Sequence, residues 1–179
     1  MNPTDIIRKY YTEGSELYEI LLTHSHSVAD KALDIARMHP EWTIDLDFVS
    51  EAALLHDIGI VQTDAPKIYC FGESRYICHG YLGAEMLRNE GLERHALVCE
   101  RHTGSGLTKE EILKNHLPIP PRDMLPETLE EKLICFADKF YSKSHLEREK
   151  TVDGIRKSLS KHGEDSLFRI NEMIQLFLG

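Results

Sequence analysis

The residues best suited to chemistry in this sequence are histidines and aspartates that interrupt apolar stretches. The centre of the pattern is the doublet His56-Asp57, whose histidine shares a helical face with Val49, Ala52 and Ala53. A lone histidine in such a setting is more often a packed core residue than a metal ligand. The balance changes here because other ligand-type residues lie on the apolar faces of separate predicted helices.

His24 and Asp138 are two such residues. His24 lies three residues after Leu21 and four before Val28, so it is expected to point into a helix bundle. His26 lies roughly 200° further round an ideal helix and is expected in solvent. Asp138 is flanked by apolar residues, where an ionised carboxylate is costly unless a cation or hydrogen bonds compensate it. The ordinary alternative is a salt bridge to a neighbouring lysine.

His79, at the start of one predicted helix, and His102, at the end of another, complete the set. Neutral imidazole and carboxylate groups suit Fe, Mn, Zn, Co or Ni. Two such ions can share a bridging carboxylate at a separation of ~3.5–4 Å. Four histidines and two aspartates are enough for two six-coordinate ions that keep solvent positions free. Divalent or mixed-valent ions are therefore expected, with their identity, Mg included, left open.

The elements that must position these residues are helices. Helix signals cover Thr4 or Asp5 to Tyr11, 16–38, Asp45 or Asp47 to His56, 80–89, 94–102, 109–116, Thr128 to about Ser144, 145–162 and a last segment containing 167–177. Residues 60–78 are loop-like, and the proline-rich segment 117–126 cannot be helical throughout. We therefore predict an all-α, single-domain helical bundle over residues 1–179. Its motif-bearing core is about 15–145, with helices of 146–179 packed on it.

Composition restricts the partners. Hydrophobic residues are 41% and charged residues 28%, an ordinary globular balance. There is no apolar run near ~18 residues and no signal-peptide layout, so no membrane association is expected. Four cysteines without paired spacing are expected to be reduced thiols in a cytoplasmic protein. A net charge of −9 argues against general nucleic-acid binding but not against a small phosphate substrate, because bound metal can outweigh the global field.

In this order the residues resemble the HD superfamily over about residues 15–145. The segments that carry the resemblance are HSHSVADKAL, LLHDIG, HGYLGAEMLR, ERHTG and FADKF. It implies a first ion held by His24, His56, Asp57 and Asp138, and a second held by His79 and His102, with Asp57 as the bridge. The chain looks most similar to small bacterial and archaeal HDIG phosphohydrolases, including those that hydrolyse symmetric dinucleoside tetraphosphates.

Two features depart from that pattern. Many HDIG enzymes carry a lysine directly after the glycine, where this chain has Ile60, so an expected phosphate-binding cation is missing. The Gly-Tyr-Pro signature of the cyclic-dinucleotide phosphodiesterases is also absent. Lys139, directly after Asp138, is a candidate to meet a phosphate, and Lys67, Arg75 and Arg101 are further candidates.

The expected function is that of a metal-dependent phosphohydrolase acting on a small phosphorylated metabolite, a nucleotide above all. Asp57 and Lys139 are the candidate catalytic residues, Asp57 as the shared ligand and Lys139 through its charge. Neither the general base nor the bond cleaved, phosphomonoester or phosphoanhydride, follows from the sequence, and a homodimer is left open.

Two alternatives stay open: a di-iron oxygenase of a small organic substrate, and a nucleotide sensor without turnover. Some HD proteins that resemble oxygenases have the same ligand set. A phosphate site needs several cations around the metals, whereas an oxygenase needs iron and an organic pocket. A sensor would be expected to lose a ligand.

Overall fold

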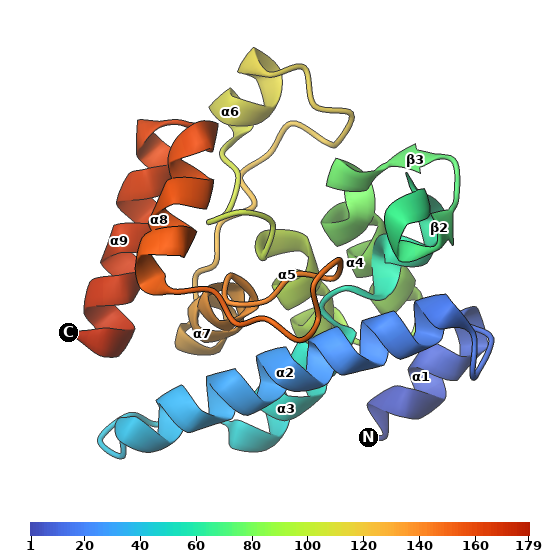
Figure 1. The fold of residues 1–179 in the computed structure, drawn as a ribbon, viewed down its shortest axis with the longest axis horizontal. Helices are drawn as coiled ribbons and strands as arrows, with labels where there is room; N and C mark the ends of the chain where they lie inside the picture. The colour runs from blue at the N-terminus through green and yellow to red at the C-terminus, as the bar shows by residue number, and fades with distance from the viewer.

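Helices form most of the chain in the computed structural model, which describes residues 1–179 (Figure 1). The α-helices are α1 (Pro3–Tyr10), α2 (Glu16–Met38), α3 (Leu46–Leu55), α4 (His79–Asn89), α5 (Glu93–Arg101), α6 (Lys109–Lys114), α7 (Leu129–Asp138), α8 (Val152–Leu159) and α9 (Glu164–Leu178). Short 3-10 turns are η1 (Ile58–Gln62), η2 (Pro66–Ile68), η3 (Tyr76–Cys78) and η4 (Ser160–His162). The predicted all-α fold class is confirmed.

Local capping signals explain where several helices begin. The side chain of Ser15 accepts a hydrogen bond from the third residue of α2, and Asp45 does the same for α3. Thr108 and Glu111 form a reciprocal capping box at the start of α6, and Thr128 caps α7. Such caps satisfy main-chain N–H groups that have no partner within the helix. The predicted starts of these helices are therefore confirmed to within a residue or two.

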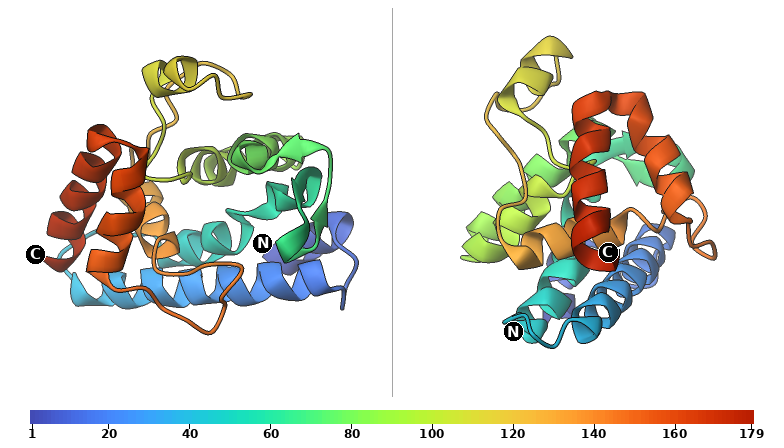
Figure 2. Two further views of the ribbon diagram at one scale, coloured as in Figure 1. Left: turned by 45° about the horizontal axis from the view of Figure 1, so that its top comes forward. Right: turned by 90° about the vertical axis from the view of Figure 1, so that its left-hand side faces the viewer.

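The long helix α2 runs along one side of the molecule, with α3 and α7 packed against it (Figures 1 and 2). Helices α4 and α5 form a second packed pair, and η1 lies against α4. Helices α8 and α9 make a C-terminal hairpin that packs on α7, while α6 projects from the body (Figure 2). None of the helices combines the length and the apolar character that a bilayer crossing requires.

Two apolar clusters meet along α2. The larger one joins the C-terminal half of α2 to α3, α7, α8 and α9, and it includes Val28. The other joins the N-terminal half of α2 to α1, η1, α4 and α5, and it includes Leu21. His24 lies between these two residues on the same buried face. The polar residues predicted to bind metal therefore lie where the two clusters meet.

The segment between η1 and α4, expected to be loop-like, contains a very small sheet. Its strands are β1 (Thr63–Ala65), β2 (Cys70–Phe71) and β3 (Ser74–Arg75), in the order β2-β1-β3. Strand β1 pairs antiparallel with β2 and parallel with β3. These short pairings tie the segment down immediately before η3 and the first residue of α4.

Two helix predictions, Thr128 to about Ser144 and 145–162, are wrong in their bounds. Helix α7 ends at Asp138 rather than near Ser144, and residues 139–151 form a loop that leads to the short α8. Phe140 is almost fully buried in the larger apolar cluster, and its carbonyl accepts a hydrogen bond from the amide of Lys150. Burying this ring turns the chain away from the helix axis, so the charged segment that follows is a loop before it becomes helical.

Candidate metal centre

The six residues predicted to bind metal converge from five parts of the chain. His24 lies within α2, His56 and Asp57 follow α3, His79 begins α4, His102 follows α5, and Asp138 ends α7. All six are buried. Five of them lie at or next to a helix terminus, where the end of the helix can aim a side chain at a common point.

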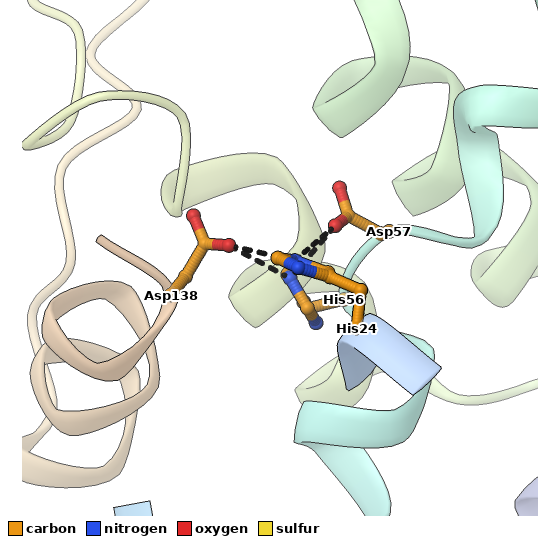
Figure 3. Close-up of side chains that lie close together, drawn as sticks. All are labelled: His24, His56, Asp57 and Asp138. Carbon is orange, nitrogen blue, oxygen red and sulfur yellow. Dashed lines mark hydrogen bonds and ion pairs between the residues drawn. The ribbon is translucent and has the colours of Figure 1, made fainter. Parts of the chain in front are cut away.

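His24, His56, Asp57 and Asp138 form the first cluster (Figure 3). His24 Nε2 lies 3.0 Å from Asp138 Oδ1 and 3.1 Å from Asp57 Oδ2. His56 Nε2 lies 2.9 Å from Asp57 Oδ2 and 3.4 Å from Asp138 Oδ1. Two imidazole nitrogens and one oxygen from each carboxylate thus face one another across a small space. His26 is exposed, as predicted.

Asp57 also belongs to a second cluster with His79 and His102. Its Oδ1 lies 3.4 Å from Nε2 of each of these histidines, whose own Nε2 atoms are 3.1 Å apart. One carboxylate therefore presents Oδ2 to the first cluster and Oδ1 to the second. This is the arrangement that a bridging carboxylate between two ions requires.

Main-chain carbonyls orient three of the four imidazoles. His56 Nδ1 donates to Ala53 O at 2.6 Å, His79 Nδ1 to Tyr76 O at 2.7 Å, and His102 Nδ1 to Cys99 O at 2.7 Å. A neutral imidazole that donates through Nδ1 carries a lone pair on Nε2. For His79 and His102 these lone pairs face Asp57 Oδ1. At His56, burial lowers the pKa but the charge of Asp57 outweighs it and raises the pKa to about 9, so Asp57 holds a proton on this imidazole that a bound cation would replace.

The arrangement fits bound cations. His56 Nε2 and Asp57 Oδ1 are buried without a hydrogen-bond partner, and the one ammonium group in contact with Asp57 Oδ2 is that of Lys143. Buried polar atoms are ordinarily paired, and unpaired ones are costly. A divalent cation in each cluster would satisfy these donors at once. Imidazole nitrogen with carboxylate oxygen is a donor set for transition-metal ions such as Fe, Mn, Co, Ni or Zn.

Charge distribution around the site supports the same assignment. Burial lowers the pKa of His79 to about 3, against the opposing pull of Asp57. Burial lowers the pKa of His102 as well, so both imidazoles are neutral and able to bind metal near pH 7. Burial would favour the neutral acid of Asp57, but His56 and Lys143 hold its pKa well below the usual range. The shared carboxylate is therefore ionised.

Two lysines reach the clusters. Lys139 Nζ lies 2.7 Å from Asp138 Oδ2 and donates to His102 O at 3.0 Å. Lys143 Nζ lies 2.5 Å from Asp57 Oδ2. Both side chains are only 11% exposed. Lys139 was predicted as a site residue, but Lys143 was not, because it lies near the end of the helix predicted from Thr128 to about Ser144 and belongs to none of the motif segments.

A cleft of about 630 Å³ opens over the clusters. Its lining includes His79, His102 and Asp138, both lysines, and further basic residues on η4 and α9: Lys161, His162 and Arg169. The other cationic candidates do not line it. Lys67 and Arg75 are exposed, and Arg101 pairs with Glu131 at 2.9 Å. These three residues are therefore not brought to the site.

The glycine of LLHDIG has a packing role. A Cβ on Gly59 would overlap the carbonyl of His79 and the main chain of Gly83. A Cβ on Gly83 would in turn meet Cys99 Sγ and the Gly59 amide. The absence of both side chains lets η1 pack directly against α4. That close approach brings the first residue of α4 to the carboxylate that follows α3.

Comparisons with known proteins agree with this geometry. The family model described as HD domain matches residues 21–142. A protein of Methanocaldococcus jannaschii described as uncharacterised is 35% identical over 148 residues, which cover 80% of each chain. Proteins named tRNA (cytidine(56)-2'-O)-methyltransferase match from Thermoplasma volcanium, with 30% identity over 177 residues, and from Picrophilus torridus, with 32% identity over 156 residues.

The T. volcanium match covers 98% of this chain but 46% of the relative, and the P. torridus match covers 87% and 40%. The chain therefore spans less than half the length of these two methyltransferases. No solved structure matches it. The residues matched by the family model cover more than half of the chain and include all six members of the two clusters. The chain belongs to the HD-domain family.

Proposed function

We propose that this chain is a metal-dependent phosphohydrolase of a small phosphorylated metabolite, with a nucleotide as the first candidate. Its HD domain points to metal-dependent hydrolysis in general. One observation carries the more specific proposal: two histidine–aspartate clusters share Asp57 below a cleft, with two buried lysines beside them.

When bound, the ions would act as Lewis acids on phosphate oxygens and lower the pKa of a water molecule. The chain supplies the rest of the site. Asp57 fixes the relative position of the two clusters, because its Oδ2 faces the first cluster and its Oδ1 faces the second. Asp138 and the imidazoles complete the donor sets. The buried ammonium groups of Lys139 and Lys143 supply positive charge where a phosphate in the cleft would come to lie.

The same lysines weigh against the oxygenase alternative. An oxygenase needs iron and a pocket for its organic substrate, and neither of these requires buried ammonium groups, which are costly to desolvate. Here Lys139 and Lys143 lie at the clusters, and Lys161 adds a further cation to the cleft, while Arg169 is paired there with Glu111 at 2.8 Å. A nucleotide sensor without turnover is also less favoured, because all six residues of the two clusters are retained.

The names of two relatives favour a second substrate candidate for the same chemistry. The T. volcanium and P. torridus proteins are named as tRNA methyltransferases, and this chain corresponds to less than half of each. The second candidate substrate is therefore a phosphate group carried by an RNA. The net charge of −9 favours a free nucleotide over a long nucleic acid, which needs a basic surface.

The test begins with metal analysis of protein purified without added metal. A phosphate-release screen follows, over nucleoside mono-, di- and polyphosphates and short oligoribonucleotides with a terminal phosphate. Release from the free nucleotides supports the first candidate, and release from the oligonucleotides alone supports the second. Protein that contains iron, consumes oxygen with an organic substrate and releases no phosphate would establish the oxygenase alternative instead.

Two variants separate the proposed roles. Asp57→Ala should abolish hydrolysis, because it removes a donor from both clusters. Lys139→Met should retain measurable turnover and mainly raise KM, because Lys139 contributes charge to phosphate binding. Equal loss of kcat in the two variants would contradict this division.

A further inference from the structure

We propose that Lys143 is the principal phosphate-binding cation of this site. The loop after α7 supplies it in place of the lysine that many HDIG enzymes carry directly after the glycine, where this chain has Ile60. The inference rests on the proposed function and deepens it. The Lys143 ammonium would pair with Asp57 before ions bind and with the anionic substrate afterwards. It depends on three features of Lys143: its place in the fold, its single ion pair and the carboxylate oxygen it contacts.

Lys143 is carried by the loop of residues 139–151, yet its side chain is only 11% exposed. Its ammonium lies 2.5 Å from Asp57 Oδ2 and 6.0 Å from the ring centre of Tyr76, another residue that lines the cleft. Lysine is seldom buried unless it is paired. Asp57 is the one carboxylate with which Lys143 forms an ion pair.

That carboxylate oxygen is also the one that the first cluster uses. Asp57 Oδ2 lies 3.1 Å from His24 Nε2 and 2.9 Å from His56 Nε2. An ammonium and a divalent cation on the same oxygen repel each other strongly at such separations. Binding of an ion in the first cluster therefore favours movement of the Lys143 ammonium away from Asp57. Its flexible four-carbon stem allows this movement without a change in fold.

The cleft is where the displaced ammonium would lie. Lys143 lines it together with His79, His102 and Asp138, so its ammonium stays beside both clusters after leaving Asp57. A phosphate in the cleft would contact both the Lys143 ammonium and the ions. Its negative charge would neutralise the ammonium, as the Asp57 carboxylate did before the ions bound. Ion binding thus converts an internal counter-ion into an anion-binding group.

Lys139 differs in a way that makes the inference testable. Its ammonium is fixed by two partners, Asp138 Oδ2 at 2.7 Å and the carbonyl of His102 at 3.0 Å. The carbonyl bond does not compete with an ion, so Lys139 stays in place and adds a constant positive charge. Lys143 alone should therefore oppose ion binding and then promote phosphate binding.

The first measurement is Mn²⁺ binding to chelator-stripped protein by titration calorimetry. Lys143→Met removes the competing charge and should tighten binding of the first ion by about tenfold or more, given the strength of charge repulsion at this range. Lys157→Met, an exposed lysine on α8 outside the cleft, makes the same change in net charge and should leave the affinity unchanged. Lys143→Arg should resemble the wild type.

The second measurement is the binding of inorganic phosphate to the Mn²⁺-loaded proteins. Lys143→Met should bind phosphate about tenfold more weakly, as expected for loss of a charge-assisted contact. Lys143→Arg should retain most of the affinity. If Lys143→Met fails to fold by circular dichroism, Lys143→Gln replaces it in both measurements.

The inference is overturned if loss of the charge leaves Mn²⁺ affinity unchanged. It is also overturned if loaded wild type does not bind phosphate, or binds it no better than the variant. Failure of the proposed function is a separate outcome: loaded wild type would release no phosphate from any substrate, while the Mn²⁺ and phosphate shifts remained. The site would then bind phosphate without hydrolysing it.

Discussion

Replacing Gly59 with alanine tests why the HDIG segment needs its glycine. The added Cβ would overlap the carbonyl of His79 and the amide of Gly83, and would lie 2.8 Å from Gly83 Cα. All of these atoms belong to the main chain of α4. No side-chain rotation can relieve the overlap, so η1 and α4 must move apart.

Extra methylene groups in a well-packed interior typically cost about 1–3 kcal/mol, and the upper part of that range applies where main chain meets main chain. In a chain of this length about 1 kcal/mol lowers Tm by roughly 2–4 °C, so a loss of 2–3 kcal/mol corresponds to roughly 4–12 °C. The displacement falls on His79, the first residue of α4. Binding of the second ion should therefore weaken more than binding of the first.

Thermal unfolding followed by circular dichroism measures the first effect, and metal titration measures the second. Gly154→Ala is the matched control, since the nearest atom to its added Cβ is the Thr151 hydroxyl at 3.3 Å, and the helix cap that this hydroxyl forms with the Gly154 amide at 3.1 Å needs to adjust by only a few tenths of an ångström. Because alanine is favoured over glycine within helices by about 0.5–1 kcal/mol, this control should be as stable as the wild type or slightly more so. A Gly59→Ala protein with unchanged Tm and two bound ions would refute the packing argument.

Three further outcomes are expected. His24→Ala should lose metal while His26→Ala keeps it, measured by metal content after dialysis, and the reverse result would contradict the assignment of the buried face of α2. Removal of both His79 and His102 should reduce Mn²⁺ stoichiometry from two to one; a single ion in both proteins would leave only the first cluster. Glu111→Gln should lower the free energy of unfolding at pH 7 by about 1 kcal/mol, as the salt bridge is partly exposed. Burial favours the protonated acid of Glu111, but hydrogen bonds from Arg169 on α9 outweigh it and lower the pKa of Glu111 from 4.5. The stabilisation from this salt bridge is therefore present above pH 4.5 and is lost on acidification. Urea titrations should show the difference between the two proteins closing below that pH, and a constant difference would contradict the link.

Much of the fold could be predicted from local sequence. The bounds of α2 follow from the cap at Ser15 and the proline at position 40, and its buried face follows from residues such as Leu21 and Val28. These signals act within a few residues of the element they define. The end of α7 could not be read in this way. It depends on Phe140 entering a core formed by helices distant in sequence.

The same division applies to the site. The side-chain types, their buried faces and the resemblance to the HD superfamily were enough to select the four histidines and two aspartates before any contact was known. The tertiary structure alone decided that Asp57 presents Oδ2 to one cluster and Oδ1 to the other, and that Lys143 reaches the shared carboxylate. Periodicity reports which face of a helix is buried, because that follows from the geometry of one segment. The path of a loop, and so the place of a lysine on it, depends on packing between segments far apart in the chain.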